Sequence, residues 1–501
     1  MKGKHWGIGV VVAGSWIASL AMGGERDMVS ISASVLEMKS DGTSQVIARP
    51  NLVVQIGKWA TYRDGGEMMF PSEFTLPNIP EELAADAKIK GEVDAKPKWM
   101  TNQHRLVIPA QPRAFETHSH GLTVKFRPRL ADSGKLVVDC EVERKVFEGF
   151  VNYGSAITVG KKSASGKSKP VILSQNRIEL PVFHTRSQEL LFLPTGSGLV
   201  PKILKESVKP EEKKGQATKL EIALSAKRLE TPKASAKKKI PKKPQIYVTI
   251  KVIESGHEVG TSESELEPIM SGMSILTDLQ FQVMIRALNQ TKGVDLLSAP
   301  SIMLRPGQAG NVEVGKEFIY PVAYDPPELP KDEESEAGTK KKGNEKVMGF
   351  PVTPAEPTEF VTTRTGVSIE VLARVLSDGR IELELEPGVT EFMEFTNFGK
   401  PIVYLDKNGL GKSREIVMTE NRMEMPNFRK RSVKTTVRIP DNGTVVLGGL
   451  IREEIQDVED KVPVLGDLPL IGHLARSKVE LHIKRHLFFT VKAQLVDENG
   501  Q

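Results

Sequence analysis

Residues 366–386, GVSIEVLARVLSDGRIELELE, consist of two alternating runs on either side of a short polar break. In 366–376 and again in 380–386, apolar and polar residues alternate with period two, which indicates strands with one buried face. Asp378-Gly379 lies between the two runs, and this dipeptide favours the tight turn of a β-hairpin. The stretch therefore predicts two adjacent antiparallel strands.

The same pattern continues outward in both directions. Alternating runs recur at 29–38, 246–254 and 487–496, and Ser133-Gly134 separates another pair of runs. In the same way PIVYLD and REIVMTE flank KNGLGKS, at 401–420, which predicts a further hairpin. Strands dominate every part of the chain that shows a clear period.

One helix is predicted, over DLQFQVMIRALNQTK at 278–292. Thr277 precedes it as an N-cap, and Gly293 follows it as a residue that ends helices. The fold class is therefore mainly β, a duplicated β-domain with one short helix in its second copy.

The composition is that of a globular protein. The 501 residues include 69 Lys and Arg against 64 Asp and Glu, so the net charge is 69 − 64 = +5, with 39% hydrophobic and 27% charged residues. These values exclude a wholly disordered chain and a helical polytopic membrane protein. The single cysteine, Cys140, excludes an intramolecular disulfide and a metal cluster with paired thiolates, and we expect it to be a small core residue.

The N-terminus has the pattern of a secretory signal peptide. Lys2 and Lys4 precede an apolar stretch from Trp6 to Gly23, whose end is rich in small residues. We expect cleavage after about Ala21 or Gly23 and export of the rest of the chain. The alternative is an uncleaved membrane anchor, for which 18 mostly small apolar residues are marginal.

The chain contains an internal duplication. Residues 46–71 align without gaps on 296–321, and residues 121–187 align on 366–432. In the first block Pro50, Gly57, Gly65, Glu67 and Pro71 coincide with Pro300, Gly307, Gly315, Glu317 and Pro321. Ungapped alignments of this length indicate that the chain contains the same structural unit twice.

The duplication predicts the domain organisation. A signal peptide at 1–23 is followed by a degenerate copy 1 at 28–230 and a copy 2 at 245–501, with 231–244 between the copies. That segment, TPKASAKKKIPKKP, has six lysines, three prolines and no acidic residue, so we expect a stiff solvated linker. Residues 325–346 are polar and of both charge signs, and are expected to form a long mobile loop.

No motif in the chain carries catalytic chemistry. GKSKP at 166–170 lacks the glycine that a P-loop needs at 161, where Lys161 stands. His118 and His120 lack an acidic or thiol partner at a metal-ligand spacing. We therefore predict no enzyme, no cofactor and no metal site, and no nucleic acid as a partner.

VPVLGDLPLIGHLARS, residues 462–477, resembles the signature of the secretins, the ring-forming outer-membrane channels of type II and III secretion and type IV pili. Ala475 stands where the family has an aromatic residue. Upstream, LLSAPSIMLRPGQAGNVEVGKEFIYP and DNGTVVLGGLIRE are similar to two further secretin motifs. The residues that carry the resemblance are Ser298, Pro300, Gly307, Gly315, Gly448, Gly449, Val462, Pro463, Leu465, Gly466, Asp467, Pro469 and Gly472.

The resemblance implies a homo-oligomeric β-barrel channel in the outer membrane, built with strands from every subunit, for protein secretion or pilus export. Its partners would be other components of the secretion or pilus machinery. In this reading Ser298, Pro300, Gly307 and Gly315 set strand ends and turns, and the signature organises the channel wall. The amino-acid sequence of these motifs looks closest to that of secretin-like proteins of the Planctomycetes and Verrucomicrobia type.

Copy 1 departs from the family pattern, because SVKPEEKKGQ at 207–216 stands in place of the signature. Typical secretins carry α/β modules ahead of the channel domain, and copy 1 occupies that place. It is interpreted as a collar beneath the channel or a domain that packs on copy 2. The alternative function is a periplasmic structural β-protein that has lost the pore.

Overall fold

A computed structural model was analysed for the whole chain. The structure describes residues 27–38, 42–77, 108–161, 169–175, 177–194, 198–209, 219–229, 241, 243–258, 275–290, 294–328, 353–407, 413–461 and 476–497. The predicted signal peptide and most of the predicted linker and of the 325–346 loop lie outside these residues.

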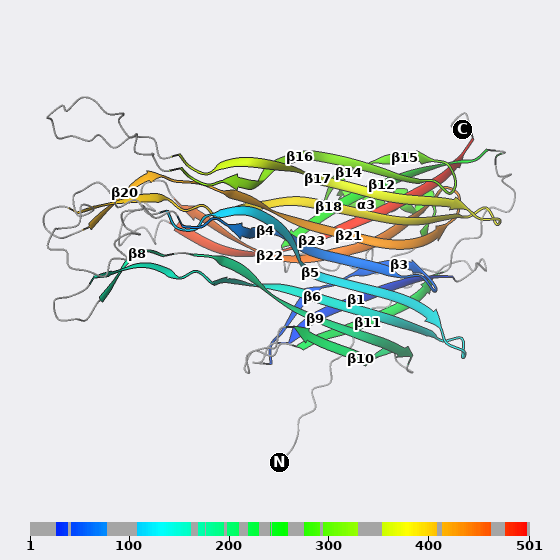
Figure 1. Cartoon of the computed structure of the whole chain (residues 1–501). Helices are drawn as coiled ribbons and strands as arrows, with labels where there is room; N and C mark the ends of the chain where they lie inside the picture. Colours follow the sequence, from blue (N-terminus) through cyan, green and yellow to red (C-terminus); the bar gives the residue numbers. More distant parts are fainter. Residues whose placement is uncertain are drawn as a thin grey trace, which may run out of the picture.

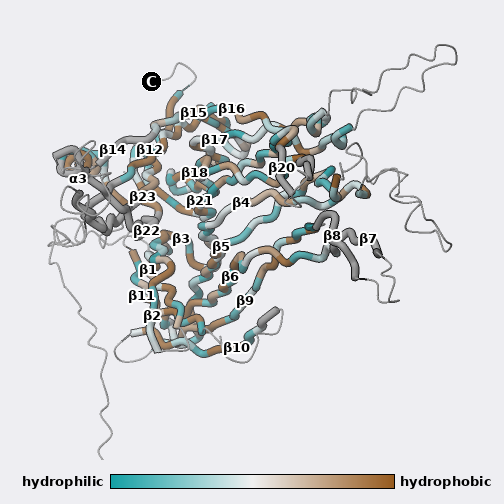
Figure 2. The backbone as a smooth tube through the Cα atoms, turned by 90° about the vertical axis from the view of Figure 1, so that its left-hand side faces the viewer, coloured by the Kyte–Doolittle hydropathy of each residue, from teal (hydrophilic) through white to brown (hydrophobic). Residues whose placement is uncertain are grey.

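Long antiparallel strands form a nine-stranded sheet that runs the length of the molecule (Figure 1). In spatial order it consists of β16 (Ala309–Asp325), β17 (Glu356–Val375), β18 (Ile381–Asn397), β21 (Glu424–Ile439), β4 (Ala60–Phe74), β5 (Pro112–Leu130), β6 (Leu136–Asn152), β9 (Glu179–Pro194) and β10 (Leu199–Lys209). β10 is at one edge, and β16 lies at the far end of this ladder from it (Figure 2). The sheet also curls, so that Ala323 of β16 meets Ala114 of β5.

Two smaller sheets form a second layer. One contains β1 (Met28–Met38), β2 (Ser44–Ala48), β3 (Asn51–Gln55) and β11 (Lys219–Leu229). The other contains β12 (Gln245–Glu258), β13 (Ile275–Leu276), β14 (Val294–Ser298), β15 (Ser301–Leu304), β22 (Gly443–Lys461) and β23 (Arg476–Val496). Two separate hairpins, β7 (Ala156–Lys161) with β8 (Lys169–Gln175) and β19 (Ile402–Lys407) with β20 (Ser413–Thr419), extend from one end of the molecule (Figure 1).

The core lies between the layers and follows from the period of two. In β18, Ile381, Leu383 and Leu385 are almost fully buried, and they belong to one cluster with Ile250 of β12 and Phe489 of β23. Burial of such side chains contributes about 1.5–3 kcal/mol each, which makes this face the main source of stability. Cys140 is 1% exposed in the same cluster, so the expectation that it is a core residue is confirmed.

The two halves of the chain repeat one strand order. β4, β5, β6 and β9 of the first half correspond in sequence to β16, β17, β18 and β21 of the second, and a hairpin follows β6 and β18 alike. The agreement extends to single hydrogen bonds. The Gly57 N–H donates to the Pro128 carbonyl at 2.7 Å, and the Gly307 N–H donates to the Ala373 carbonyl at 2.7 Å.

An asparagine makes the same contacts in each half. Asn152 Oδ1 accepts hydrogen bonds from the N–H groups of Gly154 and Ile178, and Asn397 Oδ1 accepts them from Gly399 and Met423. These four distances lie between 2.9 and 3.0 Å. Each asparagine side chain thereby ties the strand before the hairpin to the strand that follows it.

The two copies do not form separate bodies, because β21 of copy 2 pairs with β4 of copy 1 in the middle of the large sheet. The register runs from Phe428 opposite Glu67 to Lys434 opposite Thr61. Copy 1 was expected to be a collar beneath the channel or a domain that packs on copy 2. In the structure, a continuous sheet joins the two copies.

The predicted turns and helix are present. Gly134 and Gly379 have φ values of +74° and +83° at corresponding hairpin turns. Helix α3 (Asp278–Gln290) begins after Thr277, whose Oγ1 accepts a hydrogen bond from the Gln280 N–H, while the Gln280 side chain accepts one from the Thr277 N–H. This reciprocal capping box confirms the predicted N-cap. Among the described residues no helix has the length and apolar character to cross a membrane.

Candidate functional site

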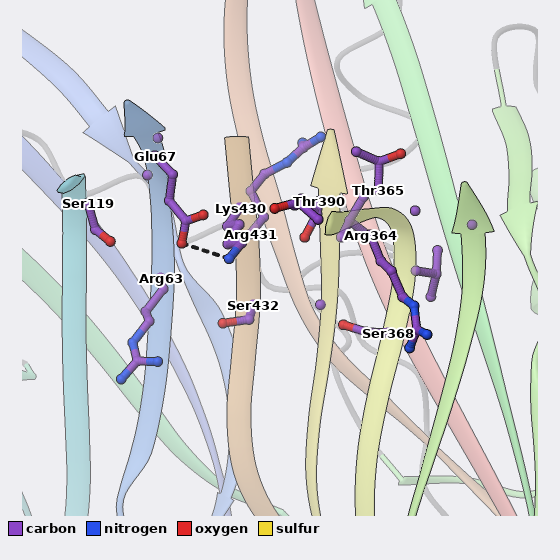
Figure 3. A pocket seen from close by; sticks show the side chains of 18 of the residues that line it. Arg63, Glu67, Ser119, Arg364, Thr365, Ser368, Thr390, Lys430, Arg431 and Ser432 are labelled. Carbon is purple, nitrogen blue, oxygen red and sulfur yellow. Dashed lines mark hydrogen bonds and ion pairs between the residues drawn. The ribbon is translucent and has the colours of Figure 1, made fainter. Parts of the chain in front are cut away.

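The face of the large sheet that is turned away from the core carries a polar groove of about 1350 Å³. Its lining comes from both copies, through β4, β5, β6, β16, β17, β18 and β21 (Figure 3). Alternation along each strand explains the polarity. Tyr62 and Val433 are buried in the core, whereas the adjacent Arg63 and Ser432 line the groove.

Charged side chains in the groove pair with their neighbours on adjacent strands. Arg364 of β17 donates to Glu313 at 2.6 Å and to Glu317 at 3.3 Å, both on β16. These hydrogen bonds lower the pKa of the Glu313 carboxyl and raise the pKa of Arg364. Lys430 of β21 lies 2.7 Å from Glu67 of β4 (Figure 3). The groove therefore presents paired charges of both signs.

Side chains with hydroxyl groups line the groove between these ion pairs. Ser119, Ser368, Thr390 and Ser432 all line the groove (Figure 3). Such a surface is well hydrated and offers few apolar contacts to a bound solute. Within the described ranges there is no cluster of three or more His, Cys, Asp or Glu side chains that could hold a metal ion. The geometry suits a polar wall better than a catalytic centre.

Pairs of glycines bring adjacent strands into close approach beside the groove. Gly315 of β16 lies opposite Gly366 of β17, which has φ +127°. Copy 1 repeats the arrangement with Gly65 of β4 opposite Gly121 of β5, which has φ +123°. A Cβ on Gly315 would lie 1.8 Å from the Thr365 carbonyl oxygen, so only glycine fits there.

The other upstream motif residues lie where strands end or bend. Ser298 is the last residue of β14, and the carbonyl of the buried Pro300 accepts a hydrogen bond from the Ile250 N–H at 2.9 Å. Gly307 has φ +82° in the turn before β16. Gly315 was expected at a strand end or turn, and this expectation was wrong. It lies in the middle of β16, because its role is the close approach to Gly366.

Gly448 and Gly449 lie in β22 at a register shift between Leu447 and Gly449 in its pairing with β23. Glycine is common at such bulges because it has no side chain to pack. The signature residues lie outside the described residues, and their roles stay predictions. They are Val462, Pro463, Leu465, Gly466, Asp467, Pro469 and Gly472.

The structure places His118 and His120 on β5, among aromatic and cationic neighbours. The His118 ring stacks on Phe183 with the centroids 4.5 Å apart, and its Nε2 contacts Lys145 Nζ. Burial lowers the pKa of both histidines, and the Lys145 ammonium adds to this effect. A nearby cation also repels a metal ion.

Sequence reasoning missed the residues that join the two copies. Arg429 of β21 donates two hydrogen bonds to Asp64 of β4, with its Nη2 at 2.9 and 3.1 Å from the two carboxylate oxygens. The buried Asn421 side chain donates to Gln111 Oε1 at 3.1 Å. Each pair joins positions more than 300 residues apart in the chain, and no local pattern marks them as partners.

Comparison with known proteins shows that part of the chain is similar to the secretins. Residues 287–497 match the secretin family model, described as bacterial type II and III secretion system protein. The secretin XcpQ of Pseudomonas aeruginosa is 24% identical over 253 residues, which are 49% of this chain and 32% of XcpQ. The secretin GspD of Vibrio cholerae is 42% identical over 69 residues, 14% of this chain and 10% of that protein. The chain thus spans a third or less of the length of these relatives.

Solved secretin structures are also similar over part of the chain. The type II secretin GspD from enteropathogenic Escherichia coli matches 51% of this chain and 70% of its own at 17% identity, with a TM-score of 0.23. The competence pilus secretin PilQ of V. cholerae matches 94% of this chain and 61% of its own at 14% identity, with a TM-score of 0.21. We draw nothing from superpositions with scores this low. The match to the family model therefore assigns residues 287–497 of the chain to a secretin domain.

Proposed function

We propose that the chain is a subunit of a multimeric outer-membrane secretin-like channel for protein secretion or pilus export. The observation that carries this proposal is the secretin domain over residues 287–497. The predicted signal peptide supports export of the chain. Secretins are in general not enzymes, and we propose no catalytic role and no cofactor for this protein.

The polar groove supports a role as part of a channel wall. Its polar lining continues from copy 1 into copy 2 through Arg63, Glu67, Lys430, Thr390 and Arg364. A wall that must let folded proteins or fibres pass benefits from hydrated, paired charges, because large apolar patches would bind the cargo. We propose that this face lines the lumen.

We propose that the chain has two secretin-like domains, residues 28–230 and 245–501, joined by the linker 231–244. The shared sheet supports a role for copy 1 as part of the same wall, since β4 continues the ladder that begins in copy 2. The partners would be further copies of this chain, other components of the secretion or pilus machinery, and the outer membrane, with no nucleic acid. The relation to proteins of the Planctomycetes and Verrucomicrobia type stays a prediction.

The test is electron microscopy of detergent-extracted envelopes from cells that express the full chain, with a heat-resistance gel. We expect rings with a central lumen that resist SDS at moderate temperature. Gly466→Val should abolish the rings, because the signature motif predicts a turn at this glycine. Ala475→Val is the matched control, because position 475 departs from the family pattern already. A monomer or dimer released by osmotic shock would contradict the proposal and favour a structural envelope protein.

A further inference from the structure

The seam between the two copies is a short antiparallel ladder between β21 and β4. It covers seven residues on each strand, from Phe428 opposite Glu67 to Lys434 opposite Thr61. Arg429 with Asp64 and Lys430 with Glu67 reinforce it through side-chain contacts. The seam joins the last long strand of one copy's wall to the first long strand of the other's.

The duplication gives each of these strands a counterpart. β9 corresponds to β21 through the 121–187 and 366–432 alignment, and β16 corresponds to β4 through the 46–71 and 296–321 alignment. A second seam between β9 and β16 would therefore place Phe183 opposite Glu317 and Ser187 opposite Glu313. It would repeat the Phe428 and Glu67 pair of the internal seam with the same residue types.

β9 and β16 do not form this seam within one chain, because β6 and β5 lie between them in the nine-stranded sheet (Figure 2). The outer edge of β16 is open between Ala309 and Val322, as far as the described residues show. Val314 and Ile319 on this strand are 48% and 64% exposed. An open edge of this length is a template for pairing with another chain.

The outer edge of β9 is covered by β10, which pairs with it from Thr185 opposite Lys209 to Pro194 opposite Leu199. The counterpart of β10 in copy 2 behaves differently. β22 follows β21 in the chain, yet it pairs with β13 and β23 in the second layer and leaves the edge of β21 to β4. β10 therefore occupies on β9 the position that β4 occupies on β21.

We propose that β10 is a displaceable cover on β9, and that its removal lets residues 183–189 of one chain pair with residues 311–317 of the next. This inference rests on the proposed function and specifies how its subunits join. The contact is head to tail, since two different edges meet, and a head-to-tail contact repeated with a constant rotation closes into a ring. Every chain would then contribute two copies of the wall and two seams.

β10 is weakly held for a strand of its length. Val200, Ile203 and Leu204 are 49–56% exposed, so the strand buries little apolar surface. Pro201 cannot donate a ladder hydrogen bond, and the register shifts between Ile203 and Lys205. Its side-chain contacts to β9 include Gln188 with Glu206 at 2.8 Å and an exposed ion pair of Lys205 with Glu189. A partner strand with a better register can compete with such a cover.

Disulfide trapping tests the register of the second seam. In a full-length Cys140→Ala background, chains with Ser187→Cys are mixed with chains with Glu313→Cys, co-assembled in the membrane and oxidised. Opposed residues on paired strands have Cβ atoms about 4.5–5.5 Å apart, close to the span of a disulfide. We expect a dimer of the two chains on a non-reducing gel. Glu317→Cys replaces Glu313→Cys in the off-register control, which should give no dimer.

A second pair of variants tests the cover itself. Gln188→Cys with Glu206→Cys, which lie opposite each other on β9 and β10, should lock β10 in place when oxidised. We expect the oxidised chain to stay monomeric and to assemble once dithiothreitol is added. Arg63→Cys with Ser432→Cys places the same bond across the internal seam and should assemble whether oxidised or reduced.

The outcomes separate this inference from the proposed function. Wild-type rings in the microscope without the 187–313 dimer would overturn the seam and leave the channel intact. Rings that form equally from the oxidised lock would overturn the cover. A wild-type chain that stays monomeric in the outer membrane would overturn both proposals together.

Discussion

Gly315 and Gly366 lie directly opposite each other on β16 and β17, so close that a Cβ on Gly366 would be 2.6 Å from the Gly315 Cα. Gly65 and Gly121 also lie opposite each other, on β4 and β5, and a Cβ on Gly121 would be 2.3 Å from the Gly65 Cα. The chain thus preserves one close approach in both copies. The glycines line the groove, and Gly65 lies on β4, one of the two strands of the seam between the copies.

This relationship predicts that Gly315→Ala destabilises the fold. The added methyl group would overlap the Thr365 carbonyl, and the strands would have to separate. We expect a loss of about 1–3 kcal/mol in the free energy of unfolding, as for other overpacked sites. Thermal unfolding followed by circular dichroism measures it. Gly388→Ala in β18 is the control, because its nearest neighbours would be 3.4 Å away. Equal melting temperatures for the two variants would contradict the prediction.

The asparagine contacts predict an unequal cost in the two copies. Asn397→Ala leaves the N–H groups of Gly399 and Met423 without their acceptor in a partly buried site. An unsatisfied buried group costs about 1–3 kcal/mol. Asn152→Ala should cost less, because its hydrogen bonds are exposed and water can replace the acceptor. Denaturant unfolding compares the two, and Asn397→Asp, which keeps an acceptor oxygen, should recover most of the loss.

The internal seam predicts strong coupling between Arg429 and Asp64. Their side chains are 22% and 15% exposed, and hydrogen bonds between charged groups contribute about 1.5–3 kcal/mol. A double-mutant cycle with Arg429→Gln and Asp64→Asn should give a coupling energy in the upper part of the usual range of about 0.5–3 kcal/mol. Lys125 with Glu141 is the control pair, both side chains being 43% exposed. Coupling no larger than in the control would show that this pair contributes no more to the seam than an exposed ion pair does.

The histidines on β5 predict a loss of stability in mild acid. Burial, with the Lys145 charge, lowers the pKa of His118 and His120 in the folded protein, whereas the unfolded chain titrates near pH 6.5. As the pH falls through 6.5, the unfolded state binds protons first, so the free energy of unfolding decreases between about pH 7 and pH 5. The melting temperature of His118→Gln with His120→Gln should depend less on pH over this window.

Phe183→Leu is the control for that experiment, because it removes the ring stacked on His118 and leaves both imidazoles in place. Its melting temperature should fall at every pH, and its pH slope should lie between those of the wild type and the double histidine variant, because the ring that helps to bury His118 is lost while both imidazoles remain. If the double histidine variant kept the wild-type slope, other groups would account for the acid sensitivity.

Much of this fold could be read from local pattern. The period of two at 366–386, the turn at Asp378-Gly379 and the cap at Thr277 each depend on neighbouring residues, and the structure contains all three. Gly315 shows the limit of such reasoning. Its presence in a motif was visible, but its role depends on a partner strand some fifty residues away, and it was assigned to a strand end.

The sequence by itself indicated the mainly β class, the hairpin turns and the resemblance of the second half to secretins, because periodicity, turn chemistry and motif order are properties of short segments. Only the tertiary structure decided that β21 pairs with β4, that β10 lies on β9, and that charged faces from both copies meet in one groove. The physical reason is that an alternating strand specifies which face is buried but offers the same backbone donors and acceptors to any partner. Which edge it meets is settled by the packing of the whole chain.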